Sequence, residues 1–595
     1  MNRQVLFIVS LLLVIGNMAM AERVDVKVAR KVAESAYAQI TGGSDLRSFG
    51  EFSLVYTASS KGSGMRNASA DSDYFVFNVG NDQGFVIVSG DDCVRPVLAF
   101  SDKGHFDPAK MPANIASWLE GYQDEISWAI AEGLRPTAEL RDEWNSYLNG
   151  RTVLRADDGV LLETAQWDQI DPYNKMTPMV DGERTLTGCV ATSMAIVMRY
   201  YKYPSQVVNP PAKNIYYVDG KEHVATIDYN GTYNWDNMPL SYWNVPYTEE
   251  QAKEVSRLMW HCGVNAETRY GLVESWAFFM DQLNAMRDVF GFSKSARRIE
   301  RNDFTWDEWV TLLRNELDQK RLVFYDGQMV GEEGGHAFIC DGYTSGDYFH
   351  INWGWGGYLN DFFLLTALAP VQEINYSRDC GMTIGLEPST GSEVGTAELR
   401  YFNLECEPFP LRVGEEFSVC LDMKNVGSAP TSDAIDFGFG VVDAGGEVDP
   451  IFTSTLDFVL DVYYSVTDLC CTLTLPFPLS EGERIVPICK AASGEWVAMG
   501  RAEDAPLGID MNGYVYPEDS DKPTSNAEVD LNGLKVWASS GSLHIQTPVA
   551  DIAHIYTYDG QLRRKLKLSA GETTVDLQEG IYIIYIGKRS YKLRL

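Results

Sequence analysis

One cysteine stands at the start of a segment with a helical pattern. Cys189 opens the stretch CVATSMAIVMRYY, and Thr187 and Gly188 before it break the helical period. A thiol at a helix N-terminus meets unpaired backbone N–H groups and the positive end of the helix dipole, and both favour the thiolate. Because a thiolate is the nucleophile of cysteine hydrolases, Cys189 is our candidate nucleophile. Taken alone, it would be interpreted as a small buried apolar side chain.

A histidine further along the chain could exchange a proton with this thiol. His336 follows Gly334 and Gly335, opens an apolar strand and lies 336 − 189 = 147 residues after Cys189. This order and separation are typical of one large class of cysteine proteases, in which the imidazole acts as general base and acid. The two glycines would also let a substrate backbone approach closely, which a purely structural histidine does not need.

The segment HINWGWGG, which begins at His350, could support the imidazole. Asn352 could hold the imidazole tautomer through a hydrogen bond, and Trp353 could cover that bond and exclude water. On its own this segment would be interpreted as a bulged strand with core tryptophans. His350 is interpreted as a packing or hydrogen-bonding residue rather than a second base.

A side-chain amide upstream could stabilise an oxyanion. Gln169 lies in the segment QWDQIDPYN, 189 − 169 = 20 residues before Cys189. An amide beside the nucleophile can donate to the oxyanion of a tetrahedral intermediate. We choose Gln169 over Gln166 because Gln169 lies in the turn next to Asp171-Pro172, outside the preceding strand-like run.

The elements that must position these residues fall into zones along the chain. Residues 1–21 have the positive start, short apolar run and Ala-Met-Ala end of a secretory signal peptide, which predicts a secreted or cell-surface protein. Residues 22–155 mix helical and strand-like runs and end in a polar stretch suited to proteolysis. In residues 156–390 helical segments precede strands, which favours an α+β domain with an antiparallel sheet. No segment is long and apolar enough to predict a transmembrane span.

Two zones rich in short strands follow. Residues 395–505 alternate apolar and polar residues between turns, which predicts a β-sandwich, and residues 525–595 form a small β domain after a polar linker. Adjacent Cys470 and Cys471 cannot easily bond each other. Either could pair with Cys420 or Cys489, and the sequence leaves these pairings open.

Composition excludes several classes of protein. The chain has 595 residues, and 49 Lys+Arg against 83 Asp+Glu give a net charge of −34, so we expect no nucleic-acid partner. Ten cysteines are too few for a disulfide scaffold of this length. The seven histidines are scattered, so we expect no metal, and no cofactor is indicated. Asp-rich loops such as DSDY leave Ca²⁺ binding as an open alternative.

The four motifs together resemble the signature stretches of the streptopain family of secreted cysteine proteases. The resemblance implies a papain-like fold, endopeptidase activity on protein or peptide substrates, and synthesis as an inactive zymogen. Carried onto this sequence, it makes Cys189 the nucleophile and His336 the general base and acid. It also makes Gln169 the oxyanion donor, and Asn352 with Trp353 the support of the histidine.

The resemblance extends to both sides of the catalytic motifs. YFVFNVGNDQGFVIVSGDD is similar to the family's propeptide, so residues 22–155 would be an intramolecular inhibitor, removed by cleavage near residues 151–157. Gly335 matches a position that contacts the substrate backbone. Ser275 lies in a loop, residues 271–279, that would border an apolar pocket for the second substrate residue. Trp276 and Phe278 make this loop bulkier than the family's Gly/Ser-rich form.

Beyond residue 390 the chain resembles extensions found on relatives from Bacteroidota. These are an immunoglobulin-like (Ig-like) module and a terminal unit similar to the sorting domains of the type IX secretion route, which would make the outer-membrane secretion machinery a partner. One more small β-sandwich is the equal alternative for the terminal unit. The expected fold class is therefore multidomain, with an α+β propeptide, an α+β papain-like protease domain, an Ig-like β-sandwich and a C-terminal β domain.

Three functions compete. The first is a secreted cysteine endopeptidase made as a zymogen. The second is a catalytically silent surface adhesin built on the same fold, against which the joint presence of Cys189, His336, Gln169 and Asn352 argues. The third uses the same Cys–His pair for transamidation or for cleavage of peptidoglycan amides.

Overall fold

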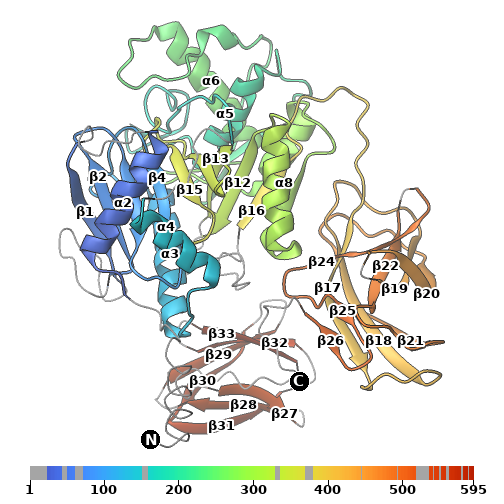
Figure 1. Cartoon of the computed structure of the whole chain (residues 1–595). Helices are drawn as coiled ribbons and strands as arrows, with labels where there is room; N and C mark the ends of the chain where they lie inside the picture. The colour runs from blue at the N-terminus through green and yellow to red at the C-terminus, as the bar shows by residue number, and fades with distance from the viewer. Residues whose placement is uncertain are drawn as a thin grey trace, which may run out of the picture. The chain divides into compact units, whose positions relative to one another are not determined.

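A computed structural model of the chain describes most of its residues (Figure 1). The described ranges are 23–42, 50–59, 72–150, 159–328, 335–368, 380–443, 445–491, 493–516, 535–539, 542–547, 551–557, 562–577, 581–586 and 589–594. The predicted signal peptide and the expected cleavage stretch at 151–157 lie outside them. Two compact units are formed, Met1–Asp519 and Ser520–Leu595, and each is described by itself.

The first part of the larger unit combines three helices with a four-stranded antiparallel meander. The helices are α2 (Val26–Ile40), α3 (Ala113–Ala131) and α4 (Ala138–Leu148), and the strands are β1 (Phe52–Ala58), β2 (Tyr74–Val79), β3 (Phe85–Ser89) and β4 (Val97–Ser101). Strands β2 to β4 are buried along their whole length, which explains their nearly continuous apolar sequences. Helix α2 lies across this part of the sheet, and the Asp25 carboxylate caps it by accepting from the N–H groups of Lys27 and Val28 (Figure 1).

The next part supplies helices first and an antiparallel sheet afterwards, in agreement with the α+β prediction. The helices are α5 (Cys189–Tyr201), α6 (Glu249–Asn265), α7 (Phe279–Asn284) and α8 (Trp306–Asp318). The strands are β5 (Gly159–Leu161), β11 (Arg297–Glu300), β12 (Val323–Gln328), β13 (Gly335–Thr344), β14 (Tyr348–Asn352), β15 (Asp361–Leu364) and β16 (Cys380–Ile384). Capping boxes at Thr248 and Thr305 begin α6 and α8.

These two parts share one sheet, which sequence reasoning did not foresee. Strand β4 pairs antiparallel with β15, so the described strands form a single 11-stranded sheet in the order β1-β2-β3-β4-β15-β14-β13-β12-β16-β11, with β5 beside β13. Helix α3 fastens the junction, because the Tyr122 hydroxyl donates to the carbonyl groups of Leu98 in β4 and Leu364 in β15. The N-terminal part is thereby docked on the strands that follow His336.

One short hairpin precedes α5 in the chain and another follows it. They are formed by β6 (Met179–Val180) with β7 (Glu183–Arg184) and by β8 (Asn214–Val218) with β9 (Lys221–Ala225), while β10 (Arg269–Tyr270) pairs parallel with β8.

Two sheets that enclose one apolar core complete the larger unit. Their strands are β17 (Leu399–Glu407), β18 (Glu416–Asn425), β19 (Ile435–Val442), β20 (Val448–Leu456), β21 (Ser465–Thr474), β22 (Arg484–Lys490), β23 (Trp496–Ala498), β24 (Gly500–Arg501), β25 (Gly508–Ile509) and β26 (Tyr514–Val515). Cys420 and Cys470 form a disulfide between β18 and β21, which is one of the pairings the sequence had left open. The predicted β-sandwich is therefore present, and its strands run past the expected end at residue 505.

Ion pairs fix this sandwich to the part of the unit that contains Cys189 and His336. Arg301 pairs with Glu503 at 2.7 Å, and the two side chains are only 2% and 7% exposed. Lys424 pairs with both Glu300 and Asp303 at 2.8 Å. The sandwich is thus packed on β11 and the turn after it rather than tethered by a linker.

The smaller unit also consists of strands. They are β27 (Lys535–Ser539), β28 (Ser542–Thr547), β29 (Asp551–Thr557), β30 (Leu562–Leu568), β31 (Gly571–Asp576), β32 (Ile581–Ile586) and β33 (Arg589–Arg594), arranged in sheets of three and four strands around a small core. Among the described residues of both units, no helix meets the length and apolarity needed to cross a bilayer.

The Glu503→Gln substitution tests whether the sandwich interface stabilises the larger unit. It leaves the Arg301 guanidinium buried without its carboxylate, which typically costs about 3–5 kcal/mol. We expect the thermal midpoint of this unit to fall by several degrees in calorimetry. Glu249→Gln is the matched control, because the exposed pair of Lys175 with Glu249 contributes at most about 1 kcal/mol. Equal midpoints for the two variants would contradict a stabilising interface.

Candidate active site

Cys189 is the first residue of α5, as its sequence context predicts. Gly188 caps the helix with a φ of 90°, a backbone conformation that glycine adopts without strain. A Cβ atom at this position would lie 2.8 Å from the carbonyl oxygen of Ser275. A glycine is therefore required immediately before the thiol, both by its φ and by the close approach of the loop that contains Ser275.

The environment of the Cys189 thiol opposes ionisation overall. The side chain is 7% exposed, and this burial raises its pKa. The backbone N–H of Ala337, together with those of Val190 and Cys189, lowers the pKa, whereas the negative charge of Glu274 raises it. Because burial is the largest cause, the thiol stays protonated at neutral pH in this conformation.

His336 lies near the start of β13, opposite Gly327 of β12. Its Nε2 atom is buried and has no hydrogen-bond partner among the described residues, and burial lowers the pKa of the imidazole. The group of β13 that acts on the Cys189 thiol is the N–H of the next residue, Ala337. The fold therefore brings the strand of His336 to the nucleophile, but no thiolate–imidazolium pair is formed.

Gln169 is buried beside the turn that precedes Cys189. Its backbone carbonyl oxygen accepts from the backbone N–H of Thr187 at 3.1 Å, and its backbone N–H donates to the Asp168 carboxylate at 2.6 Å. Gln166, in contrast, is exposed and forms an isolated bridge with Ser241. Gln169 is thus buried next to the turn before Cys189, whereas Gln166 is exposed.

Asn352 and Trp353 are buried, but neither is bonded to His336. The Asn352 amide donates to Thr164 Oγ1 and to the Ala165 carbonyl, both at 2.9 Å, and its oxygen accepts from the N–H of Gly354. The expected bond to the imidazole is absent from this conformation of the described residues. Asn352 thus forms hydrogen bonds with the backbone groups of Ala165 and Gly354. The spacing of residues in the sequence could not indicate these partners.

Two residues of the N-terminal part reach this region, and sequence reasoning missed both. The Asn114 amide donates to the Trp353 carbonyl at 3.1 Å and accepts from Trp355 Nε1 at 2.9 Å. The Trp118 ring meets the rings of Phe338 and Trp353 edge-on, with centroids 5.5 and 5.6 Å apart. Both belong to α3, whose amphipathic sequence shows which residues are buried but not what they contact.

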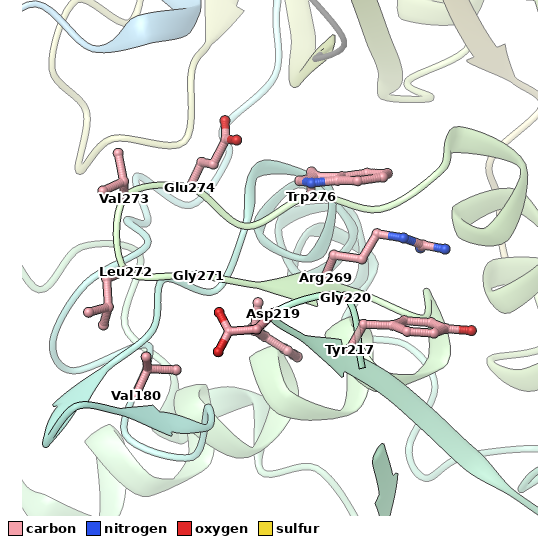
Figure 2. A pocket seen from close by; sticks show the side chains of 11 residues that line it. Val180, Tyr217, Asp219, Gly220, Arg269, Gly271, Leu272, Val273, Glu274 and Trp276 are labelled. Carbon is pink, nitrogen blue, oxygen red and sulfur yellow. The ribbon is translucent and has the colours of Figure 1, made fainter. Parts of the chain in front are cut away.

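The two expected substrate-binding residues occupy different settings. Gly335 is the first residue of β13 and pairs with Gln328. The Ser275 hydroxyl donates to the Leu186 carbonyl at 2.9 Å and accepts from the N–H of Gly271 at 3.0 Å, so it fastens its loop to the segment before Cys189. A pocket of about 650 Å³ lies beside this loop, and Ser275 does not line it (Figure 2).

His350 takes the structural role that its sequence context suggested. Its ring is buried and hydrogen-bonds through Nδ1 to Asp341. Burial lowers the pKa of this imidazole, but the Asp341 carboxylate outweighs burial and raises it. Among the described residues, no group of three or more His, Cys, Asp or Glu side chains is arranged to hold a metal ion.

Two parts of the chain match models of known protein families. Residues 167–363 match the model of the peptidase C10 family, and residues 21–126 match that of the Spi protease inhibitor. Streptopain from Streptococcus pyogenes is 32% identical over 317 residues, which cover 50% of this chain and 75% of streptopain. The chain belongs to the peptidase C10 family. It thus combines the peptidase domain of that family with an inhibitor-type N-terminal domain, as a cysteine protease zymogen does.

Other relatives differ in length from this C10 chain. The thiol protease/hemagglutinin PrtT from Porphyromonas gingivalis is 35% identical over 344 residues, which cover 54% of this chain but only 38% of PrtT. Among solved structures, a fragment of Prevotella intermedia prointerpain A is 26% identical with a TM-score of 0.45, and it covers 57% of this chain and 100% of that fragment. Active interpain A is 31% identical with a TM-score of 0.34, and it covers 38% of this chain and 95% of interpain A.

Alkylation of Cys189 by iodoacetamide tests the electrostatics of the thiol. Because burial raises its pKa, we expect the full chain to react slowly at pH 7, with a pH–rate midpoint above the usual thiol value. Glu274→Gln removes a charge that raises this pKa, so its midpoint should shift to lower pH. Mass spectrometry of the labelled peptide gives the rate.

Glu222→Gln serves as the matched control for this measurement, because Glu222 is an exposed residue paired with Lys213. A midpoint that moved equally in both variants would show that Glu274 does not act on Cys189.

Proposed function

We propose that this chain is an exported cysteine endopeptidase made as a latent precursor, with Cys189 as its nucleophile. The observation that carries the proposal is the position of the thiol. It lies at the N-terminus of α5, within reach of the Ala337 N–H of β13 and beside the turn held by Gln169. A structural cysteine needs neither a histidine on the strand beside it nor a buried glutamine bonded to the turn before it.

The mechanism assigns a role to the thiol, the histidine and the glutamine. The Cys189 thiolate attacks the carbonyl carbon of a peptide bond, and the resulting oxyanion accepts hydrogen bonds from the Gln169 amide and the Cys189 backbone N–H. The His336 imidazolium then protonates the leaving amine as the carbon–nitrogen bond breaks. Water, deprotonated by His336, attacks the thioester and releases the acid and the thiol.

In the active enzyme His336 must reach the sulfur, which it does not in the described conformation. Removal of residues 22–155 would free Trp353 and Trp355 from Asn114, and Phe338 from Trp118. We propose that this release allows His336 to pair with Cys189 and Asn352 to approach the imidazole under the cover of Trp353. The N-terminal part is then the intramolecular inhibitor, and cleavage within residues 151–157 activates the enzyme.

The remaining assignments follow from the same scheme. Gly335 would present its backbone to the substrate, and Ser275 would hold the loop that borders it. A papain-like domain, an Ig-like sandwich and a terminal sorting domain of the type IX route complete the proposed organisation, with residues 1–21 as the export signal.

Hydrolysis of casein by the processed chain under reducing conditions tests the function. Cys189→Ala should abolish hydrolysis, because no other group supplies the nucleophile. Gln169→Ala should lower kcat by about 10²–10³, the usual effect of losing one oxyanion donor. Gln166→Ala, in the same segment but exposed, should stay near wild type. Activity that survives in Cys189→Ala would refute the proposal.

The stability of the precursor should depend on pH through two buried carboxyl groups, which lie where the N-terminal part meets the peptidase part. The Glu125 carboxylate of α3 accepts from the Ala367 N–H at 2.5 Å and the Thr366 hydroxyl at 3.1 Å, and burial raises its pKa to about 7. Burial also raises the pKa of Asp361 in β15 to about 7. The folded, docked state therefore binds protons that the unfolded chain releases. This contribution to stability is complete below about pH 4.5 and is lost as the pH rises through 7.

Thermal unfolding of the inactive Cys189→Ala chain between pH 5 and pH 8 measures this dependence. We expect the midpoint to fall as the pH rises and the Glu125→Gln background to show a smaller fall. Glu120→Gln, an exposed change on the same helix, should keep the full dependence. The assignment to Glu125 is wrong if its variant and the Glu120 control have the same pH profile.

A further inference from the structure

The pocket beside the Cys189 turn is built from three separate segments. Strand β10 pairs in parallel with β8, which places Arg269 opposite Tyr217, and the tip of the β8–β9 hairpin is formed by Asp219 and Gly220. The chain after β10 turns back so that Arg269 and Trp276 exchange backbone hydrogen bonds of 2.8 and 3.1 Å. Val180 of the β6–β7 hairpin closes the pocket, whose volume is about 650 Å³.

The pocket wall is joined directly to the nucleophile. The Gly271 carbonyl accepts from the Leu186 N–H at 3.1 Å, and the Ser275 hydroxyl donates to the Leu186 carbonyl at 2.9 Å. Leu186 precedes Cys189 by three residues, and a Cβ atom on Gly188 between them would lie 2.8 Å from the Ser275 carbonyl oxygen. A group held in the pocket is therefore held at a fixed place relative to the reacting sulfur.

The charges of the pocket are divided between its two ends, as Figure 2 shows. At one end the Arg269 guanidinium packs against three aromatic rings. Its Cζ atom lies 4.5, 4.8 and 4.6 Å from the ring centroids of Tyr217, Trp276 and Phe278. Its polar contact is with the Glu267 carbonyl at 3.0 Å. The Arg269 guanidinium is therefore already in contact with protein groups, and it forms part of an aromatic wall of the pocket.

The other end carries negative charge and apolar side chains together. The carboxylates of Asp219 and Glu274, which both line the pocket, make no ion pair or hydrogen bond with any described residue. The Asp219 carboxylate lies toward Leu272 and Val180, whereas Glu274 lies beside Val273 with its carboxylate directed away from Asp219 (Figure 2). This combination suits a long basic side chain, because its methylene stem can cover apolar surface while its charged head meets a carboxylate. An apolar pocket alone would need neither carboxylate.

We propose that this pocket is a subsite that binds a lysine or arginine side chain of the peptide substrate, with Asp219 and Glu274 as the residues that select it. The inference rests on the proposed endopeptidase function. Binding of a cation also offsets the Glu274 charge, which acts on the Cys189 thiol. Occupation of the subsite thus favours the thiolate at the moment when the substrate is in place.

Paired peptide substrates test the subsite on the processed chain. Each pair differs only in having lysine or its uncharged analogue norleucine at one position, and the positions on both sides of the scissile bond are scanned. For one position we expect kcat/KM to be about tenfold higher with lysine, the size of a half-exposed charged hydrogen bond. The double variant Asp219→Asn, Glu274→Gln should bring this ratio close to one.

Matched controls separate the subsite from the fold and from the catalytic function. Asparagine tolerates the φ of 50° at position 219, so Asp219→Asn keeps the hairpin turn. Glu222→Gln removes an exposed charge from the same hairpin and should leave the lysine ratio unchanged.

Three outcomes would overturn the subsite. The first is a ratio near one at every position while Cys189-dependent cleavage persists, which leaves the endopeptidase function intact. The second is a preference for glutamate, which would assign selection to Arg269. A wild-type chain that cleaves none of the peptides would refute the endopeptidase function, and the subsite with it.

Discussion

The position of one sulfur atom constrains the rest of this unit. Cys189 can begin α5 only because Gly188 adopts a left-handed conformation and because nothing larger than a hydrogen fits beside the Ser275 carbonyl. The N–H of Ala337 comes from a different element, β13, which is held between β12 and β14 of the large sheet. The thiol is thus fixed from both sides, and small shifts of β13 change its electrostatics directly.

The inhibitor-type domain contacts this arrangement through the sheet. Strand β4 extends the catalytic sheet at β15, and α3 crosses the junction with Tyr122 bonded to both sides. From the same helix, Asn114 and Trp118 hold the loop after β14 and the face of β13. In the proposed precursor this docking would keep His336 from the nucleophile without occupying the thiol itself, because the domain binds both the loop and the strand.

Local patterns predicted the elements of the site well, whereas long-range contacts escaped them. The helical period after Gly188 and the apolar run after His336 correspond to α5 and β13. Membership of the peptidase C10 family, shown by the match to streptopain, agrees with the motifs. The partners of Asn352 and the pairing of β4 with β15 depend on segments that are far apart in sequence. The apolar pattern of a strand shows that the strand is buried, but it does not show which other segment the strand contacts. A pocket beside the loop 271–279 was expected, but the β8–β9 hairpin carries no catalytic motif, so the part of the pocket wall formed by Tyr217 and Asp219 could not be foreseen.

One loop joins substrate selection to the state of the nucleophile. The backbone of residues 271–276 supports the turn before Cys189, while Glu274 both lines the pocket and raises the pKa of the thiol. An empty pocket therefore keeps a negative charge near a thiol that must become negative, and the Coulomb energy of that pair grows in a partly buried site. A substrate cation removes this opposition without any movement of the backbone. The same charge that selects the substrate would then restrain the nucleophile until the substrate arrives, so binding and activation need not depend on separate parts of the structure.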